Sequence, residues 1–166
     1  MDQLCIVTTG GTIDKIYFDD KSDYQIGAPQ IGEILTQLGV GFRFDVIPIL
    51  RKDSLHVTDE DRALMRSTIE AQPHRHVLVT HGTDTMVETG KFLDRELAKP
   101  LQVPVILTGA MVPLGFEGTD GIQNLTESLL AAKLLPPGVY VVMHNQTFPV
   151  NRVRKDRDLG TFVRTE

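Results

Sequence analysis

The stretch LCIVTTGGT (residues 4–12) passes directly from apolar residues to a glycine pair flanked by threonines. Three other apolar runs also end in short polar clusters, at residues 52–54, 80–85 and 108–111. If these runs are parallel strands of one sheet, their carboxyl ends share an edge, and such folds bind ligands at that edge. The sequence therefore predicts a crevice built from residues that lie far apart along the chain.

Short β-branched runs alternate with segments of helical periodicity, which is typical of βα units and a mostly parallel sheet. Strands are expected at residues 4–7, 42–50, 77–79, 103–107 and 139–143, and apolar helix faces at residues 31–38, 64–69, 86–97 and 122–132. The first, third and fourth strands are apolar at consecutive positions, as strands covered on both faces should be. We therefore expect a three-layer α/β fold with helices on both faces and these strands in the middle of the sheet.

Two segments do not fit this alternation. Residues 13–27 are polar with little periodicity, and we expect a long mobile loop there that acts as a lid beside the crevice. Residues 151–166 carry several basic side chains that acidic neighbours partly offset. A solvated surface or a subunit contact is the favoured interpretation of this tail, over a polyanion site.

Length and composition favour a single domain over residues 1–166. A net charge of -5 gives no general attraction to nucleic acid. Cys5 is the sole cysteine, so neither a disulfide framework nor a cysteine metal cluster is expected. Residues 1–10 lack the pattern of an export signal, and no apolar run approaches the roughly 20 residues that span a bilayer. We expect a cytoplasmic protein without nucleic-acid or membrane partners.

The polar clusters supply the groups needed for acyl transfer. Gly10-Gly11 allows a sharp turn after which Thr12 can project its hydroxyl, although a tight turn alone would use the same residues. Thr83 and Asp84 stand where the next helix begins, and an ordinary helix cap is the competing interpretation. Taken together, the hydroxyls, carboxylates and helix-end amides provide a nucleophile, proton-transfer groups and anion-stabilising donors.

Cofactor and metal chemistry find little support in the sequence. The Gly-x-Gly-x-x-Gly spacing of a dinucleotide site is missing, so NAD is a poor prospect. His81 is expected to support the backbone of its cluster. The other histidines show no metal-ligand spacing, and they are His56, His74, His76 and His144. No cofactor and no metal are expected.

The sequences TTGGTI (residues 8–13) and THGTDT (residues 80–85) resemble the two signatures of the bacterial-type L-asparaginase family. Further similarities lie at residues 24–27, 53–54, 108–113 and 120–125, so the resemblance covers nearly the whole chain. It extends only to the family's amino-terminal domain, because the smaller carboxyl-terminal domain of longer members is absent. The resemblance implies a flavodoxin-like fold, hydrolysis of asparagine to aspartate and ammonia, and a homodimer or higher homo-oligomer.

The resemblance also implies roles for individual residues. Thr12 corresponds to the nucleophile, Tyr24 to its partner on the closing loop, and Thr83 with Asp84 to the second catalytic pair. The implied substrate-binding residues are Gly11, Asp53, Ser54, Gly82 and Ala110. A small zwitterion needs both an anion contact and a cation contact, which leaves its side-chain amide facing the nucleophile.

One position departs from the family pattern. The family carries a catalytic lysine, and counting back from Thr108 places Val103 there, which cannot transfer a proton. Lys99 is near in sequence but would need an unusual loop path to reach the crevice. Three alternatives therefore remain open: an aspartate- or asparagine-binding protein with weak turnover, an amidohydrolase for glutamine or another small amide, and direct attack by water in place of a covalent route.

Overall fold

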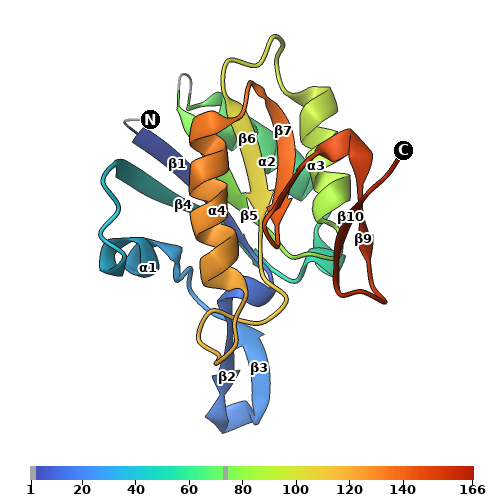
Figure 1. Ribbon diagram of the computed structural model, residues 1–166. Coiled ribbons are helices and arrows are strands. Elements are labelled where there is room, and N and C mark those ends of the chain that lie inside the picture. The colour runs from blue at the N-terminus through green and yellow to red at the C-terminus, as the bar shows by residue number, and fades with distance from the viewer. Residues whose placement is uncertain (1–2, 73–74) are drawn as a thin grey trace.

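The computed structural model describes residues 3–72 and 75–166, and its centre is a six-stranded sheet (Figure 1). The strand order is β4-β1-β5-β6-β7-β8. The strands are β1 (Gln3–Gly10), β4 (Arg43–Lys52), β5 (His76–Thr80), β6 (Pro104–Thr108), β7 (Gly138–Met143) and β8 (Gln146–Pro149). All five predicted strands are confirmed, and the three consecutive apolar runs form the interior strands β1, β5 and β6. His74, for which no metal role was expected, lies outside the described residues.

The order of the sheet places a topological switch point at β1. Strands β4, β1, β5, β6 and β7 pair in parallel, and only β8 pairs antiparallel to its neighbour. The chain moves from β1 to β4 on one side and then returns to β5 on the other. This is the flavodoxin-like order, in which ligands bind beyond the carboxyl ends of the strands at the point of reversal.

Helices cover both faces of the sheet, as expected (Figure 1). The helices are α1 (Ile31–Gln37), α2 (Asp59–Glu70), α3 (Met86–Glu96) and α4 (Gly121–Leu134). Thr58 begins α2 with a capping box, because its hydroxyl accepts from the Asp61 N–H while the Asp61 carboxylate accepts from the Thr58 N–H. None of the described helices is long and apolar enough to cross a membrane.

Alternate side chains of β1 explain the three layers. Leu4 and Ile6 belong to the core that includes α1 and α4 residues, whereas Cys5 and Val7 belong to the core that includes α2 and α3 residues. Successive side chains of a strand point to opposite faces, so an interior strand needs apolar residues at every position. Burying both faces of β1 fixes the position of the turn that follows it.

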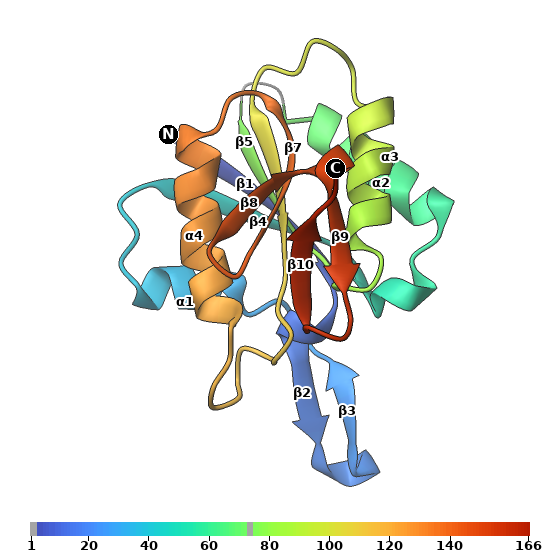
Figure 2. The same ribbon diagram turned by 45° about the vertical axis from the view of Figure 1, so that its right-hand side comes forward.

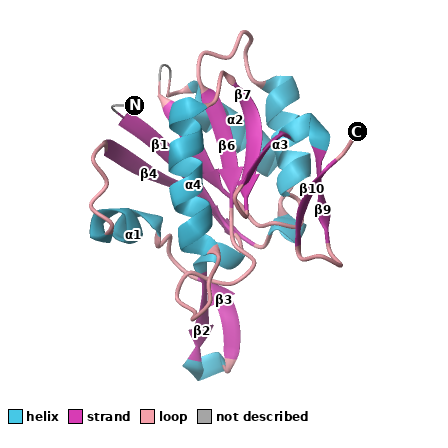
Figure 3. Cartoon of the chain, viewed as in Figure 1, coloured by secondary structure: helices cyan, strands magenta, loops and turns pink. Residues whose placement is uncertain are grey.

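The two segments that broke the sequence pattern are both hairpins (Figures 2 and 3). Residues 13–27 were expected to be a loop, but they form β2 (Lys15–Phe18) and β3 (Asp23–Ile26), which pair antiparallel and project from the body of the protein. The expected surface tail contains β9 (Val153–Asp156) and β10 (Thr161–Arg164). Both secondary-structure expectations were therefore wrong, since polar residues at alternate exposed positions hid the strand periodicity.

The β9–β10 hairpin is tied to the sheet through the tight turn between β7 and β8. His144 adopts a positive φ of 50° in this turn and places its ring between two other elements. Its Nδ1 lies 2.7 Å from Thr161 Oγ1 on β10, and its Nε2 lies 2.7 Å from Asp120 Oδ2 at the start of α4. The Asp120 carboxylate in turn accepts the N–H groups of Met111 and Val112. One side chain thus joins the hairpin, α4 and the loop after β6.

Candidate active site

Two glycine turns lie in backbone contact at the switch point. Gly11, after β1, has φ 89°, and a Cβ there would lie 2.5 Å from the Gly82 nitrogen. A Cβ on Gly82, after β5, would lie 2.6 Å from the Ser54 Cβ. Residues without side chains are therefore required at both positions. This close approach brings the residues that follow the glycines, Thr12 and Thr83, to one place.

Seven of the predicted site residues line a single cavity of about 50 Å³ at this edge of the sheet. They are Gly11, Thr12, Asp53, Ser54, Gly82, Thr83 and Asp84, and Lys15 from the β2–β3 hairpin lines it as well. The cavity is almost entirely polar, because its walls are turn backbones, hydroxyls and charged groups. The structure thus places together residues from the turns after β1, β4 and β5.

An ammonium group that the sequence interpretation missed completes this cluster. Lys155 Nζ, on β9, donates to Thr83 Oγ1 at 2.8 Å and to Asp84 Oδ1 at 2.7 Å. The hydrogen bond from Lys155 holds the pKa of Asp84 below its usual value, and the nearby Arg157 guanidinium acts in the same direction. Hydroxyl, ammonium and carboxylate therefore form one hydrogen-bonded set.

The proposed vacancy at Val103 is corrected by this arrangement. Val103 precedes β6 and lines a different cavity with Leu101 and Leu97, at the end of the sheet away from the glycine turns. Lys99 also stays outside, because its ammonium pairs with Asp94 at 3.4 Å and is half exposed. The chain therefore has an ammonium beside Thr83, and it comes from the segment expected to be a solvated tail.

His81 supports the second glycine turn from below, as the sequence suggested. Its fully buried ring donates from Nδ1 to the Gly82 carbonyl at 2.7 Å, and Nε2 accepts from Thr89 Oγ1 at 2.8 Å. Thr89 Oγ1 itself accepts from Arg62 Nε at 2.9 Å, which leaves its hydrogen for His81. Burial lowers the pKa of His81 to about 4, so the ring is neutral and acts as a fixed spacer.

Asp53 and Ser54 differ in how they are held. Ser54 is 2% exposed, and its hydroxyl accepts from the Thr85 N–H at 3.3 Å while its carbonyl accepts from the Thr85 hydroxyl at 2.7 Å. Asp53 accepts from the Leu55 N–H and lies 3.7 Å from the Lys15 ammonium. Ser54 therefore fixes one turn against the other, whereas the Asp53 carboxylate faces the cavity mouth.

Two predicted residues are not among the cavity walls. Tyr24 lies on the projecting hairpin with 52% of its surface exposed, and its ring packs against Tyr17 and Phe116 at centroid distances of 5.3 and 5.6 Å. Ala110 is 1% exposed and belongs to the core that includes α4. Among the described residues, no group of three or more His, Cys, Asp or Glu side chains is arranged to hold a metal ion.

The fold and the site define a flavodoxin-like α/β protein with a hydroxyl, carboxylate and ammonium cluster at its switch point. The family model "Asparaginase, N-terminal" matches residues 3–161. The chain belongs to the asparaginase family and corresponds to its amino-terminal domain.

Individual relatives agree with this assignment. The chain is 31% identical over 164 residues to the L-asparaginase of Thermococcus kodakarensis, which covers 95% of this chain and 49% of the relative. It is 31% identical over 157 residues to a glutamyl-tRNA(Gln) amidotransferase subunit of Aeropyrum pernix, which covers 88% of this chain and 36% of that protein. The crystal structure of L-asparaginase I from Vibrio cholerae matches with a TM-score of 0.87 and 26% identity, covering 98% of this chain and 51% of that one. The chain thus spans about half the length of the L-asparaginases it matches.

Proposed function

We propose that this protein is an amidohydrolase that converts L-asparagine to L-aspartate and ammonia with Thr12 as nucleophile. The observation that carries this proposal is the bonding of the Lys155 ammonium to both Thr83 and Asp84 in the cavity that Thr12 lines. A hydroxyl beside a proton-transfer group, in a site with backbone N–H donors, is the arrangement that acyl transfer requires.

In the proposed reaction the Thr12 hydroxyl attacks the carbon of the side-chain amide, and its proton leaves with the amine as ammonia. Water then hydrolyses the resulting ester and releases aspartate. Thr83, Lys155 and Asp84 relay the protons, since they are already joined by hydrogen bonds of 2.7 and 2.8 Å. Direct attack by water, positioned by the same threonines, uses the same groups and is distinguished by trapping the ester.

Substrate recognition is assigned to both sides of the cavity. Asp53 and Asp84 provide negative charge for the substrate's ammonium, while Ser54 and the glycine turns provide contacts for its carboxylate. Tyr24 is assigned to closure, because it lies on the hairpin whose first residue, Lys15, lines the cavity. Ala110 contributes through the loop after β6. An oligomer in the cytoplasm, without metal or organic cofactor, completes the proposal.

A second substrate class is favoured by the similarity to an amidotransferase. That relative makes glutamine, or an amide carried on a larger molecule, a direct competitor for asparagine as substrate. Binding without turnover loses its main argument, because that alternative depended on a missing ammonium.

The test is ammonia release from L-asparagine, L-glutamine and a simple peptide amide, measured with the full chain. Asparagine turnover that Thr12→Ala abolishes, with Thr126→Ala unchanged, supports the proposal, because Thr126 lies exposed on α4. Tight aspartate binding without any ammonia release supports the binding protein. Turnover of glutamine alone assigns the second substrate class, and mass spectrometry of quenched reactions detects the ester on Thr12.

A further inference from the structure

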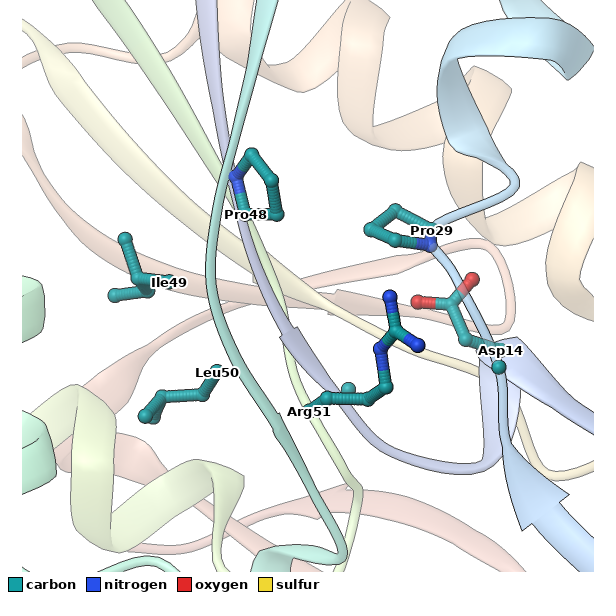
Figure 4. A pocket seen from close by; sticks show the side chains of 8 residues that line it. Asp14, Pro29, Pro48, Ile49, Leu50 and Arg51 are labelled. Carbon is teal, nitrogen blue, oxygen red and sulfur yellow. The ribbon is translucent and has the colours of Figure 1, made fainter.

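A second cavity lies behind the Gly10-Gly11 turn, on the side away from the site described above (Figure 4). Its volume is about 230 Å³, and it opens between the end of β4 and the segment that follows the β2–β3 hairpin. The walls are formed by Gly10, Asp14, Gly27, Pro29, Pro48, Ile49, Leu50 and Arg51. Sites for drug-sized ligands occupy roughly 300–1,000 Å³, so this space suits a small molecule.

A buried carboxylate forms one side of this cavity. Asp14 is 2% exposed, and its Oδ1 accepts from the Gln30 N–H at 3.0 Å. Within the described residues its second oxygen has no hydrogen-bond donor, and no lysine or arginine lies within ion-pair distance. Burial raises the pKa of Asp14 to about 6. A carboxylate left in this condition is stabilised by any donor that enters the space beside it.

A cation faces this carboxylate from the other wall. The Arg51 guanidinium extends from the end of β4 toward Asp14 in Figure 4, and its charge acts on the Asp14 carboxyl without a direct ion pair. Arg51 is exposed and has no ion-pair partner among the described residues. The cavity therefore holds one negative and one positive group that do not neutralise each other by contact.

This pair of charges selects the class of ligand. A simple cation is attracted by Asp14 but repelled by Arg51, and a simple anion meets the opposite combination. A small molecule with an ammonium at one end and a carboxylate at the other satisfies both groups at once. The wall between them is formed by Pro29, Pro48 and Ile49, which suits a short uncharged body.

The geometry points to a second binding site for a small zwitterion of the α-amino acid type, with its ammonium on Asp14 and its carboxylate on Arg51. The site shares a short helical turn with the cavity described first, because Asp14 ends the turn of residues Thr12–Asp14 that Thr12 begins. Gly10 forms part of its wall, and the adjacent Gly11 N–H donates to the Lys52 carbonyl at 3.0 Å. An occupant thus contacts the same turn that places Thr12.

The test uses three matched probes that differ only in charge: L-alanine, ethylamine and propionate. Titration is followed by backbone amide shifts of Gly10, Gly27 and Arg51 in nuclear magnetic resonance spectra of the full chain. We expect L-alanine to shift these amides with saturation in the millimolar range or below, and each singly charged probe to bind about tenfold more weakly. Absence of saturation with L-alanine, or equal binding of ethylamine, overturns the inference.

Two variants separate this cavity from the one that contains Thr12. Asp14→Asn keeps the acceptor for the Gln30 N–H but removes the charge, and it should abolish the alanine response. Arg51→Gln, on an exposed side chain that leaves the core untouched, should weaken it about tenfold even if the first variant folds poorly. Asp53→Asn should leave the response unchanged. Loss of the response in Asp53→Asn but not in Arg51→Gln places alanine in the first cavity and overturns the inference.

Discussion

Lys155 is the residue whose removal tests the site most directly. Lys155→Met retains the length of the side chain but removes the ammonium from Thr83 and Asp84. Without this group the proposed proton transfer fails, and we expect ammonia release to fall about 10²- to 10⁴-fold. Steady-state kinetics with asparagine measures the change. The matched variant Lys99→Met should keep full activity, because Lys99 pairs only with Asp94 at the surface.

The same variant makes a second prediction for Asp84. The hydrogen bond from Lys155 is the main cause of its lowered pKa, so loss of that bond should raise the pKa. Carboxyl titration by nuclear magnetic resonance gives the value in both proteins. An unchanged Asp84 titration together with full activity would contradict the assignment of Lys155 to this cluster.

Asp14 carries the opposite kind of shift and predicts a stabilising substitution. Burial raises its pKa from 3.8 to about 6, so ionisation at neutral pH weakens the native state. At 1.36 kcal/mol per pKa unit, Asp14→Asn should increase the free energy of unfolding by about 3 kcal/mol at about pH 8. At about pH 4 the two proteins should be nearly equal, because Asp14 is then protonated in the native state. Urea unfolding at the two pH values measures this difference.

The exposed Asp158 provides the control for this substitution. Asp158→Asn should change the free energy of unfolding by less than about 0.5 kcal/mol at either pH. A loss of stability in Asp14→Asn at about pH 8 would show that Asp14 has a favourable partner in the native state that outweighs its burial.

At the scale of the elements, the contact between the turns after β1 and β5 makes a steric prediction. Gly11→Ala requires a Cβ where the Gly82 nitrogen lies 2.5 Å away, at φ 89°. The two turns must separate, and we expect a loss of at least about 2 kcal/mol of stability together with loss of ammonia release. Gly115→Ala, in a loop with open space around the added carbon, should be neutral. Thermal unfolding and activity assays compare the two, and equal melting temperatures would contradict the contact.

The β9–β10 hairpin depends on His144 for its attachment. His144→Ala removes the ring that joins Thr161 to Asp120, and two hydrogen bonds to a partly buried network are lost. We expect about 2 kcal/mol less stability, faster amide exchange in β10, and lower kcat with little change in KM, since Lys155 lies on the partner strand. The exposed His56 gives the control His56→Ala. Unchanged exchange in β10 would show that strand pairing alone holds the hairpin.

Much of the layout was predictable from the sequence because apolar periodicity marks buried elements. The interior strands, the four helices and the Thr58 cap all follow from local patterns, and the glycine turns from their composition. The β2–β3 hairpin was missed because Tyr17 and Tyr24 are half exposed, so burial imposes no pattern there. Lys155 was missed because its partners lie 71 and 72 residues away. Its alternation with the buried Val153 was the available signal, since residues i and i+2 of a strand share a face.

At the scale of the whole molecule, two buried groups give opposite pH dependences. His81, with a pKa lowered from 6.5 to about 4, contributes stability above pH 6.5 that is lost as the pH falls toward 4. Asp14, with its raised pKa, contributes stability below pH 3.8 that is lost as the pH rises toward 6. Over the range that they share, the two effects offset each other.

We therefore expect the free energy of unfolding to change by less than about 1 kcal/mol between about pH 4 and pH 6. Asp14→Asn should reveal the contribution of His81, as a rise of about 3 kcal/mol across that range. Chemical unfolding at several pH values gives both profiles. A steep profile in the unmodified protein, unaltered by Asp14→Asn, would exclude this compensation.

The reacting groups come from opposite ends of the described chain, since Thr12 follows the first strand and Lys155 lies on the ninth. A growing or clipped polypeptide that has formed the central sheet but not the last hairpin holds its threonines without a proton relay. Such a species would be chemically silent toward amides, including those of asparagine and glutamine side chains in other proteins around it. Ammonia production then reports that folding has reached completion.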